Sequence, residues 1–220
     1  MRVLFVLLLF SMSLFVTSCV THTAYETARF RNRDYRTDRI TLTEGGLTSE
    51  EIKSITATKP PSNFPVDLAL IVVKDRFVKN EIEQLFVSNV IEELKKSEKI
   101  DRITPIPRFL LPYQLNFAVI QELGIRTLSE YVIVMVVDGE SFFKWTKIAE
   151  SKFQITSTVD FILVDARTTA ILASDRLFST VFYQENLFKV GEKEKALKEV
   201  FGEQGELLGQ KLAELFDQGD

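Results

Sequence analysis

The stretch Glu130-Tyr-Val-Ile-Val-Met-Val-Val-Asp138 decides the fold of this chain. Every residue from Tyr131 to Val137 is apolar, and most of them are β-branched. A strand with one exposed face alternates apolar and polar side chains, whereas a strand covered on both faces is apolar throughout. The stretch therefore predicts the central strand of a sheet that carries helices.

Two strands and two helices are predicted upstream. Residues 67–74 form a second continuous apolar run of strand length, and residues 80–96 place apolar side chains at helical spacing. Residues 100–106 predict a strand at the edge of the sheet, because prolines interrupt its end. Residues 112–123 predict another helix, which we expect Gly124 to close as a C-cap.

Two long strands and a helix are predicted downstream. Residues 153–164 and 170–182 are separated by the five-residue turn Asp165-Ala-Arg-Thr-Thr169, so they predict an antiparallel hairpin. Asp160 is the one polar intrusion near the end of the first of these strands. Apolar residues at helical spacing over 196–216 predict a long amphipathic C-terminal helix.

The C-terminal helix carries small residues at three- and four-residue steps, namely Gly202, Gly205, Gly209 and Ala213. Each glycine costs about 1 kcal/mol in helix propensity, so their number asks for an explanation. Small residues on one face permit the backbone of another element to approach closely. Alternatively, Gly202 and Gly205 break the helix into two.

The order of the predicted elements is strand–helix–strand–helix–strand–strand–strand–helix. Two strand–helix units followed by a hairpin and a closing helix predict an α/β (α+β) domain with a mixed sheet of about five strands and helices packed on it. The domain is expected to span residues 64–220. A chain of 220 residues suits one such domain with a substantial core.

Four stretches carry a resemblance to a family of envelope lipoproteins and periplasmic domains. They are Leu68-Ala-Leu-Ile-Val-Val, the helix end Glu-Glu-Leu-Lys-Lys-Ser with Lys99-Ile-Asp-Arg-Ile, Leu123-Gly124 before the central strand, and Val159-Asp-Phe-Ile-Leu-Val-Asp165-Ala-Arg-Thr168. The pattern resembles the curli-secretion lipoprotein, the lipoprotein activators of penicillin-binding proteins and the amino-terminal domain of the Tol-system periplasmic protein. Thr169 departs from the glycine that this family usually has in the turn. The resemblance implies an envelope domain and no catalytic motif.

The N-terminus has the features of a bacterial lipoprotein signal. Arg2 precedes an apolar run from Val3 to Phe15, which is shorter than a membrane-spanning helix requires. The junction Val-Thr-Ser-Cys19 resembles a lipobox, in which the cysteine receives lipid and becomes the new N-terminus. We therefore expect residues 1–18 to be removed and Cys19 to anchor the protein in a membrane. The alternatives are an uncleaved anchor helix and an ordinary secretory signal.

By resemblance to Gram-negative sorting rules, Val20 after the cysteine favours the outer membrane, with the domain facing the periplasm. Residues 19–63 are expected to form a flexible tether, rich in Thr, Ser and charged residues. Five arginines fall within residues 29–39. This segment could lie on anionic lipid head groups, and the alternatives are a solvated arm or an edge strand with arginine on one face. Thr48-Ser-Glu-Glu51 has the form of a capping box and predicts a short helix over 49–56.

Composition excludes several classes of function. The chain carries a formal charge of −4, and because Arg2 is the only charged residue before Cys19, the mature chain carries −5. Nucleic-acid binding would require a basic domain, so we expect no such partner. The only histidine is His22, in the predicted tether, which excludes a multi-histidine metal site. We expect neither a metal nor another cofactor.

The function expected is therefore non-enzymatic: a lipid-anchored domain that binds or assists another envelope protein. Aromatic residues Phe142, Phe143 and Trp145 are the candidate contact, since aromatic side chains are favoured at interfaces. Packing of these three residues into the core is the alternative. Self-association is compatible with the sequence but not indicated by it.

Two other classes of function stay open from the sequence. A carrier of lipid or another small molecule would enclose an apolar cavity, which the 18 phenylalanines permit without requiring it. A hydrolase would use carboxylates near strand ends, and the candidates are Asp138, Glu140, Asp160 and Asp165. Asp138 and Asp165 are also ordinary turn residues.

Overall fold

The computed structural model describes residues 47–58, 64–75, 78–147, 150–185 and 191–218. These residues contain a five-stranded mixed sheet with strand order β2-β1-β3-β4-β5. The strands are β1 (Val66–Lys74), β2 (Ile100–Pro105), β3 (Tyr131–Lys147), β4 (Glu150–Asp165) and β5 (Ile171–Glu185). The predicted α/β class and strand number are confirmed.

The sheet has a parallel half and an antiparallel half that meet at β3. β1 pairs in parallel with β2 and with β3, whereas β3, β4 and β5 pair in antiparallel fashion. The all-apolar run Tyr131 to Val137 thus lies in the middle of the sheet, as predicted. β2 lies at one edge, which confirms the prediction from its prolines.

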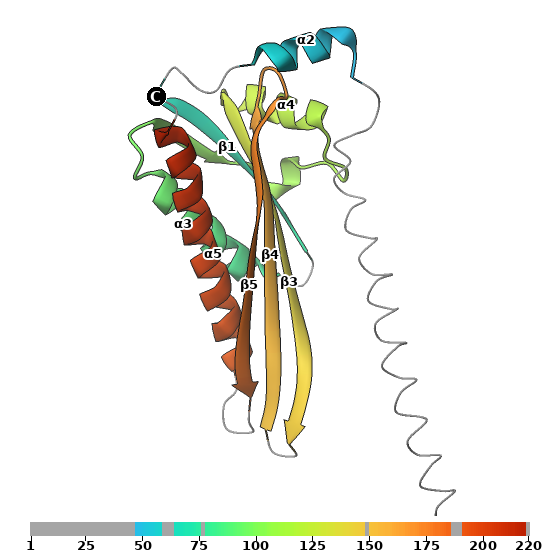
Figure 1. Ribbon diagram of the computed structural model, residues 1–220, viewed down its shortest axis with the longest axis vertical. Coiled ribbons are helices and arrows are strands. Elements are labelled where there is room, and N and C mark those ends of the chain that lie inside the picture. Colours follow the sequence, from blue (N-terminus) through green and yellow to red (C-terminus); the bar gives the residue numbers. More distant parts are fainter. Residues whose placement is uncertain (1–46, 59–63, 76–77, 148–149, 186–190, 219–220) are drawn as a thin grey trace, which may run out of the picture. The chain divides into compact units, whose positions relative to one another are not determined.

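Helices cover both faces of the parallel half. The described helices are α2 (Ser49–Ala57), α3 (Asn80–Leu94), η1 (Arg108–Leu110), α4 (Phe117–Arg126) and α5 (Glu192–Asp217). α3 and α5 pack side by side on one face, where the core gathers Phe86, Phe161, Phe201 and Phe216 (Figure 1). No helix among the described residues is long and apolar enough to cross a membrane.

The helix α4 packs mainly against β1 and β3, on the face opposite α3. Its boundaries correct the prediction, because it begins after the N-cap Asn116 and continues to Arg126. Gly124 lies inside the helix and is not its C-cap. A Cβ atom on Gly124 would stand 2.7 Å from Cβ of Ala166 and 2.8 Å from Cγ2 of Val132, so glycine here allows the helix to touch the sheet.

The helix α5 is continuous from Glu192 to Asp217, which rules out the interpretation that Gly202 and Gly205 divide it. The other interpretation, that the small residues allow the backbone of another element to approach closely, is confirmed. Asn89 of α3 donates a hydrogen bond of 3.0 Å from Nδ2 to the carbonyl oxygen of Gly202. Gly205 and Gly209 lie directly against the backbone of α3.

The antiparallel half of the sheet is longer than predicted. β1 pairs with β3 only as far as Val137, but β3 continues to Lys147 and remains paired with β4. We use the name strand extension for residues 138–147 of β3, 150–158 of β4 and 178–185 of β5. Figure 1 shows its three strands running on past the end of β1.

The turn between β4 and β5 confirms the predicted hairpin. Asp165 is fully buried, and its Oδ1 accepts hydrogen bonds from the backbone N–H groups of Arg167 and Thr168, at 2.8 and 3.0 Å. Thr169 has a positive φ of 60°. This left-handed conformation favours glycine, which gives a physical reason for a glycine at this position.

The helix α2 confirms the predicted capping box: the hydroxyl of Thr48 accepts from the N–H of Glu51, and the Glu51 carboxylate accepts from the N–H of Thr48. Thr58 follows the helix and hydrogen-bonds Thr168 in the β4–β5 turn, with 2.8 Å between the two hydroxyl oxygens. The end of the predicted tether therefore touches the domain. Residues 1–46, with the signal, Cys19, His22 and the arginine cluster, lie outside the described residues.

Candidate functional site

The strand extension has one face under α5 and one face that none of the described helices covers. On the first face, Ile155 and Tyr183 are buried against Ala196 of α5. Residues of the opposite parity on β5, Phe178 and Phe182, are 67% and 66% exposed. Because α4 packs at the other end of the sheet, against Val132, it does not cover these phenylalanines. We call the exposed side of the strand extension the open face.

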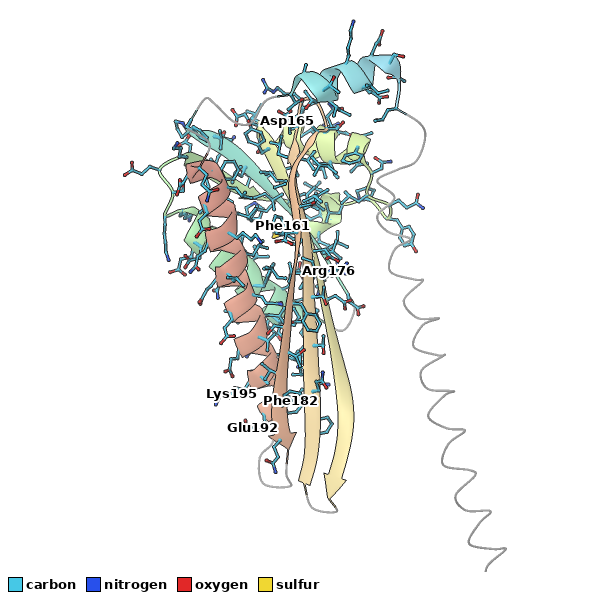
Figure 2. All side chains as sticks on the ribbon, in the orientation of Figure 1. Phe161, Asp165, Arg176, Phe182, Glu192 and Lys195 are labelled. Carbon is cyan, nitrogen blue, oxygen red and sulfur yellow. The ribbon has the colours of Figure 1, made fainter. Side chains whose placement is uncertain are left out.

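The open face is built from side chains on neighbouring strands. Phe178 pairs with Thr158 of β4, and Phe182 pairs with Gln154. At the border of the strand extension, on the side of Phe178 away from Phe182, Arg176 (labelled in Figure 2) binds Asp160 through two nitrogens, Nε and Nη2, with 3.0 Å between Nη2 and Oδ2. The hydrogen bond that Arg176 donates to the Asp160 carboxylate raises the pKa of the Arg176 guanidinium. An ion pair and two exposed aromatic rings thus lie in sequence along β5.

The predicted aromatic contact lies on β3 in this same extension. The backbone of Phe142, Phe143 and Trp145 belongs to β3 and does not form a separate hairpin loop. Phe142 pairs with Gln154, whereas Phe143 pairs with Phe153. A role for these three residues in binding stays a prediction.

Of the carboxylates considered for hydrolysis, Asp165 and Asp160 are each bound within the fold, and Asp165 lies several positions along the ladder from Asp138 and Asp160. Asp165 is used within the β4–β5 turn, and Asp160 forms the ion pair with Arg176. Asp138 pairs in register with Thr158, several residues along the strand from Asp165. The side chain of Glu140 is outside the described part of the structure. Within the described residues, no group of three or more His, Cys, Asp or Glu side chains is arranged to hold a metal ion.

A carrier would require an enclosed apolar cavity. The hollow at the start of α5 is instead an open depression lined by Gly191, Glu194, Lys195 and Lys198. Its charges are largely paired, because Glu194 binds Lys198 at 3.1 Å and Lys79 at 3.2 Å. These bonds, the one from Lys198 first, lower the pKa of the Glu194 carboxyl. This depression does not have the chemistry of a lipid cavity.

Sequence reasoning missed Phe178 and Phe182. Their stretch, Leu177-Phe-Ser-Thr-Val-Phe-Tyr183, is apolar on both parities, so the pattern alone does not show which face is exposed. The signal that could have found them is the length of the strands: the upstream strand of residues 67–74 is too short to match β4 and β5 along their whole length. A helix that packs along such a short strand leaves part of the longer strands uncovered.

No protein-family model matches this chain, and no curated protein matches it in sequence. Solved structures that match this chain include a neuraminyllactose-binding hemagglutinin homologue from Helicobacter pylori, with 10% identity and a TM-score of 0.43 over 74% of this chain and 96% of that one. The PelC dodecamer from Paraburkholderia phytofirmans matches with 14% identity and a TM-score of 0.38, over 71% and 94% of the two chains. Rare lipoprotein B from Shewanella oneidensis matches with 13% identity and a TM-score of 0.39, over 66% and 94%. Several of the matched chains are bacterial lipoproteins.

Proposed function

We propose that this chain is an outer-membrane lipoprotein that is anchored through lipid on Cys19 and binds another protein of the cell envelope without catalysing a reaction. The lipobox-like junction at Cys19 supports the anchor. Val20 supports the outer membrane, with the domain on the periplasmic side. The acidic mature chain has no basic domain of the kind that nucleic acid would require.

The observation that carries the binding function is the open face with Phe178 and Phe182. Phe178 and Phe182 lie four residues apart on one face of β5 with their rings largely exposed, and aromatic side chains are enriched at protein interfaces. Both rings lie on a sheet whose other face is held by α5, so binding requires no rearrangement of the core. A rigid platform of this kind keeps the entropic cost of association low.

Site-specific photo-crosslinking in the native envelope tests the proposal. A photoreactive phenylalanine analogue at position 182 should capture one or a few envelope proteins. The matched control is the same analogue at position 109, because Phe109 is also exposed, at 84%, but belongs to η1 and not to the strand extension. Equal capture from both positions, or none from 182, would contradict binding through the open face.

The anchor is tested separately. A Cys19→Ser variant should leave the membrane fraction, because no lipid can be attached at this position. Loss of the lipid adduct on Cys19 without release from the membrane would contradict anchoring through this residue.

A further inference from the structure

Two buried polar residues meet between α5 and the sheet. Ser157 of β4 is fully buried, and Gln204 of α5 is only 3% exposed. Nε2 of Gln204 donates a hydrogen bond of 3.4 Å to the backbone carbonyl oxygen of Ser157. This polar contact therefore crosses an interface between helix and sheet whose other buried side chains are mostly apolar.

Each of the two residues keeps one buried side-chain atom without a partner. Oγ of Ser157 and Oε1 of Gln204 make no hydrogen bond with any described residue, and both atoms are shielded from solvent. Buried polar atoms in folded proteins almost always have a hydrogen-bond partner, which can be an ordered water molecule. Two such atoms on residues that touch each other point to one shared partner.

The contact with β4 sets the orientation of the Gln204 amide. If Oε1 and Nε2 exchanged positions, Oε1 would face the carbonyl oxygen of Ser157, and two acceptors cannot bond each other. The atom left over is therefore Oε1, which can only accept a hydrogen bond, whereas the Ser157 hydroxyl can donate or accept. Water meets both requirements. A cation such as Ca²⁺ would need several oxygen ligands, usually including carboxylates, so it does not suit this pair.

The sheet carries small residues at this level. Ser157 pairs with Gly139 of β3 on one side and with Ser179 of β5 on the other. Paired residues share a face of the sheet, so all three positions lie on the side of α5. The next row toward the main core is larger, with Val137, Val159 and Leu177. Phe201 occupies the Gly139 end of the small row, because a Cβ atom on Gly139 would stand 3.0 Å from Cζ of that ring.

We propose that α5 and β4 hold one ordered water molecule between Gln204 and Ser157. The water donates one hydrogen bond to Oε1 of Gln204 and shares a second with Oγ of Ser157. Ser179, which is partly exposed, supplies a third hydroxyl at the same level and a route for exchange with solvent. A buried water typically makes about three hydrogen bonds, so these groups are sufficient.

This site is independent of the binding function proposed above. Ser157 lies between Ile155 and Val159 on the buried face of β4, whereas Phe178 and Phe182 stand on the open face. The two proposals therefore succeed or fail separately. A partner could bind the open face whether or not α5 is held to the sheet through a water molecule.

Oxygen-17 relaxation dispersion of the solvent, measured on the full mature protein, tests the proposal. The method detects water molecules with long residence times and is blind to exchanging hydroxyl protons. The double variant Ser157→Ala/Gln204→Met removes both polar partners with little change in volume. It should lose the contribution of about one long-lived water. An unchanged dispersion would overturn the proposal.

The matched control is Ser174→Ala/Gln210→Met, which makes the same two changes at exposed positions of β5 and α5. This variant should keep the dispersion of the natural protein. An equal loss in both variants would assign the long-lived water to another part of the molecule, and the proposal would be wrong.

The single variants decide the question if the double variant does not fold. Ser157→Ala and Gln204→Met each leave the water with one of its two buried partners, so each should remove the same contribution. A loss in only one variant would contradict a water shared by both residues. In the natural protein, an NOE from the Ser157 hydroxyl proton to Gln204 without one to water would mean that the two side chains bond each other directly, which also overturns the proposal.

Discussion

Gly205 of α5 lies against Phe86 of α3 so closely that a Cβ atom on Gly205 would stand 2.6 Å from the carbonyl oxygen of Phe86. One turn of the helix to either side of Gly205, the contacts differ. A Cβ atom on Gly209 would meet Cβ of Glu93 at 2.5 Å, whereas one on Gly202 would meet its nearest atom, Nδ2 of Asn89, at 3.6 Å. Two of these three glycines are thus required by packing, and one is not.

Alanine should therefore have opposite effects at these positions. Gly205→Ala and Gly209→Ala should each lower the free energy of unfolding by about 1–3 kcal/mol, because the added methyl group forces α3 and α5 apart. At Gly202 an added Cβ atom has ordinary contact distances, so Gly202→Ala should raise the free energy of unfolding by up to about 1 kcal/mol through helix propensity. Urea unfolding followed by circular dichroism measures all three.

Gly202→Ala is also the control, since it makes the same chemical change in the same helix. If all three variants were stabilised alike, the helices would not be in close contact at Gly205 and Gly209. If all three were destabilised alike, the cost would come from something other than the local distance to α3.

The sequence was sufficient for the order of elements because each carries its own periodicity. The apolar run around Ile133 identified the central strand, and the prolines near residue 105 identified an edge. The four-residue steps of Gly205 and Gly209 identified a close contact, but not its partner. That partner is α3, more than a hundred residues earlier in the chain. The spacing of residues within one helix does not show which distant segment packs against it.

The failures have a common physical origin in tertiary contacts. Gly124 has the local features of a helix end, but it is needed in mid-helix because Ala166 and Val132 leave no room for a side chain. The central strand was predicted to end at Asp138, where polar residues begin. The ladder with β4 continues past this point, because β4 offers backbone partners as far as Glu150.

Asp165 organises the turn between β4 and β5, and its removal should be costly. The Asp165→Ala variant leaves the N–H groups of Arg167 and Thr168 without their acceptor, so we expect a loss of about 1–3 kcal/mol in unfolding free energy. Asp165→Asn keeps an Oδ1 acceptor and should lose much less. Thermal and urea unfolding compare the two; equal losses would mean that the charge, and not the acceptor, matters.

A second measurement on the same variant follows from Tyr131. Burial, and then the negative charge of Asp165, raise the pKa of the Tyr131 hydroxyl. Asp165→Asn removes the charge and retains the burial, so the pKa of Tyr131 should fall only part of the way toward its ordinary value. Titration of the Tyr131 ring signals by NMR measures the shift, and an unchanged pKa would contradict the electrostatic contribution.

Thr169 should be replaceable with a gain in stability. Its φ of 60° is unfavourable for a β-branched residue and natural for glycine. Thr169→Gly should raise the free energy of unfolding by about 1 kcal/mol. Thr169→Ala removes the same hydroxyl but keeps a Cβ atom, so it should bring little or no gain. A larger gain from alanine than from glycine would show that the backbone conformation is not the cause.

The pair formed by Asp175 of β5 and Lys211 of α5 predicts a dependence of stability on pH. The hydrogen bond from Lys211, and then that from the N–H of Arg176, lower the pKa of the Asp175 carboxyl. A carboxyl whose pKa is lower in the folded state stabilises the fold above its unfolded pKa of about 3.9, and this contribution is lost as pH falls through the folded pKa.

Lys211→Met keeps most of the aliphatic stem and removes the charge, so it isolates the ion pair from packing. The difference in unfolding free energy between the natural protein and this variant should be constant near neutral pH and shrink as the pH falls below about 4. Lys195→Met is the control in the same helix and should show no such convergence. A difference that persists unchanged in acid would assign the effect of Lys211 to the packing of its stem.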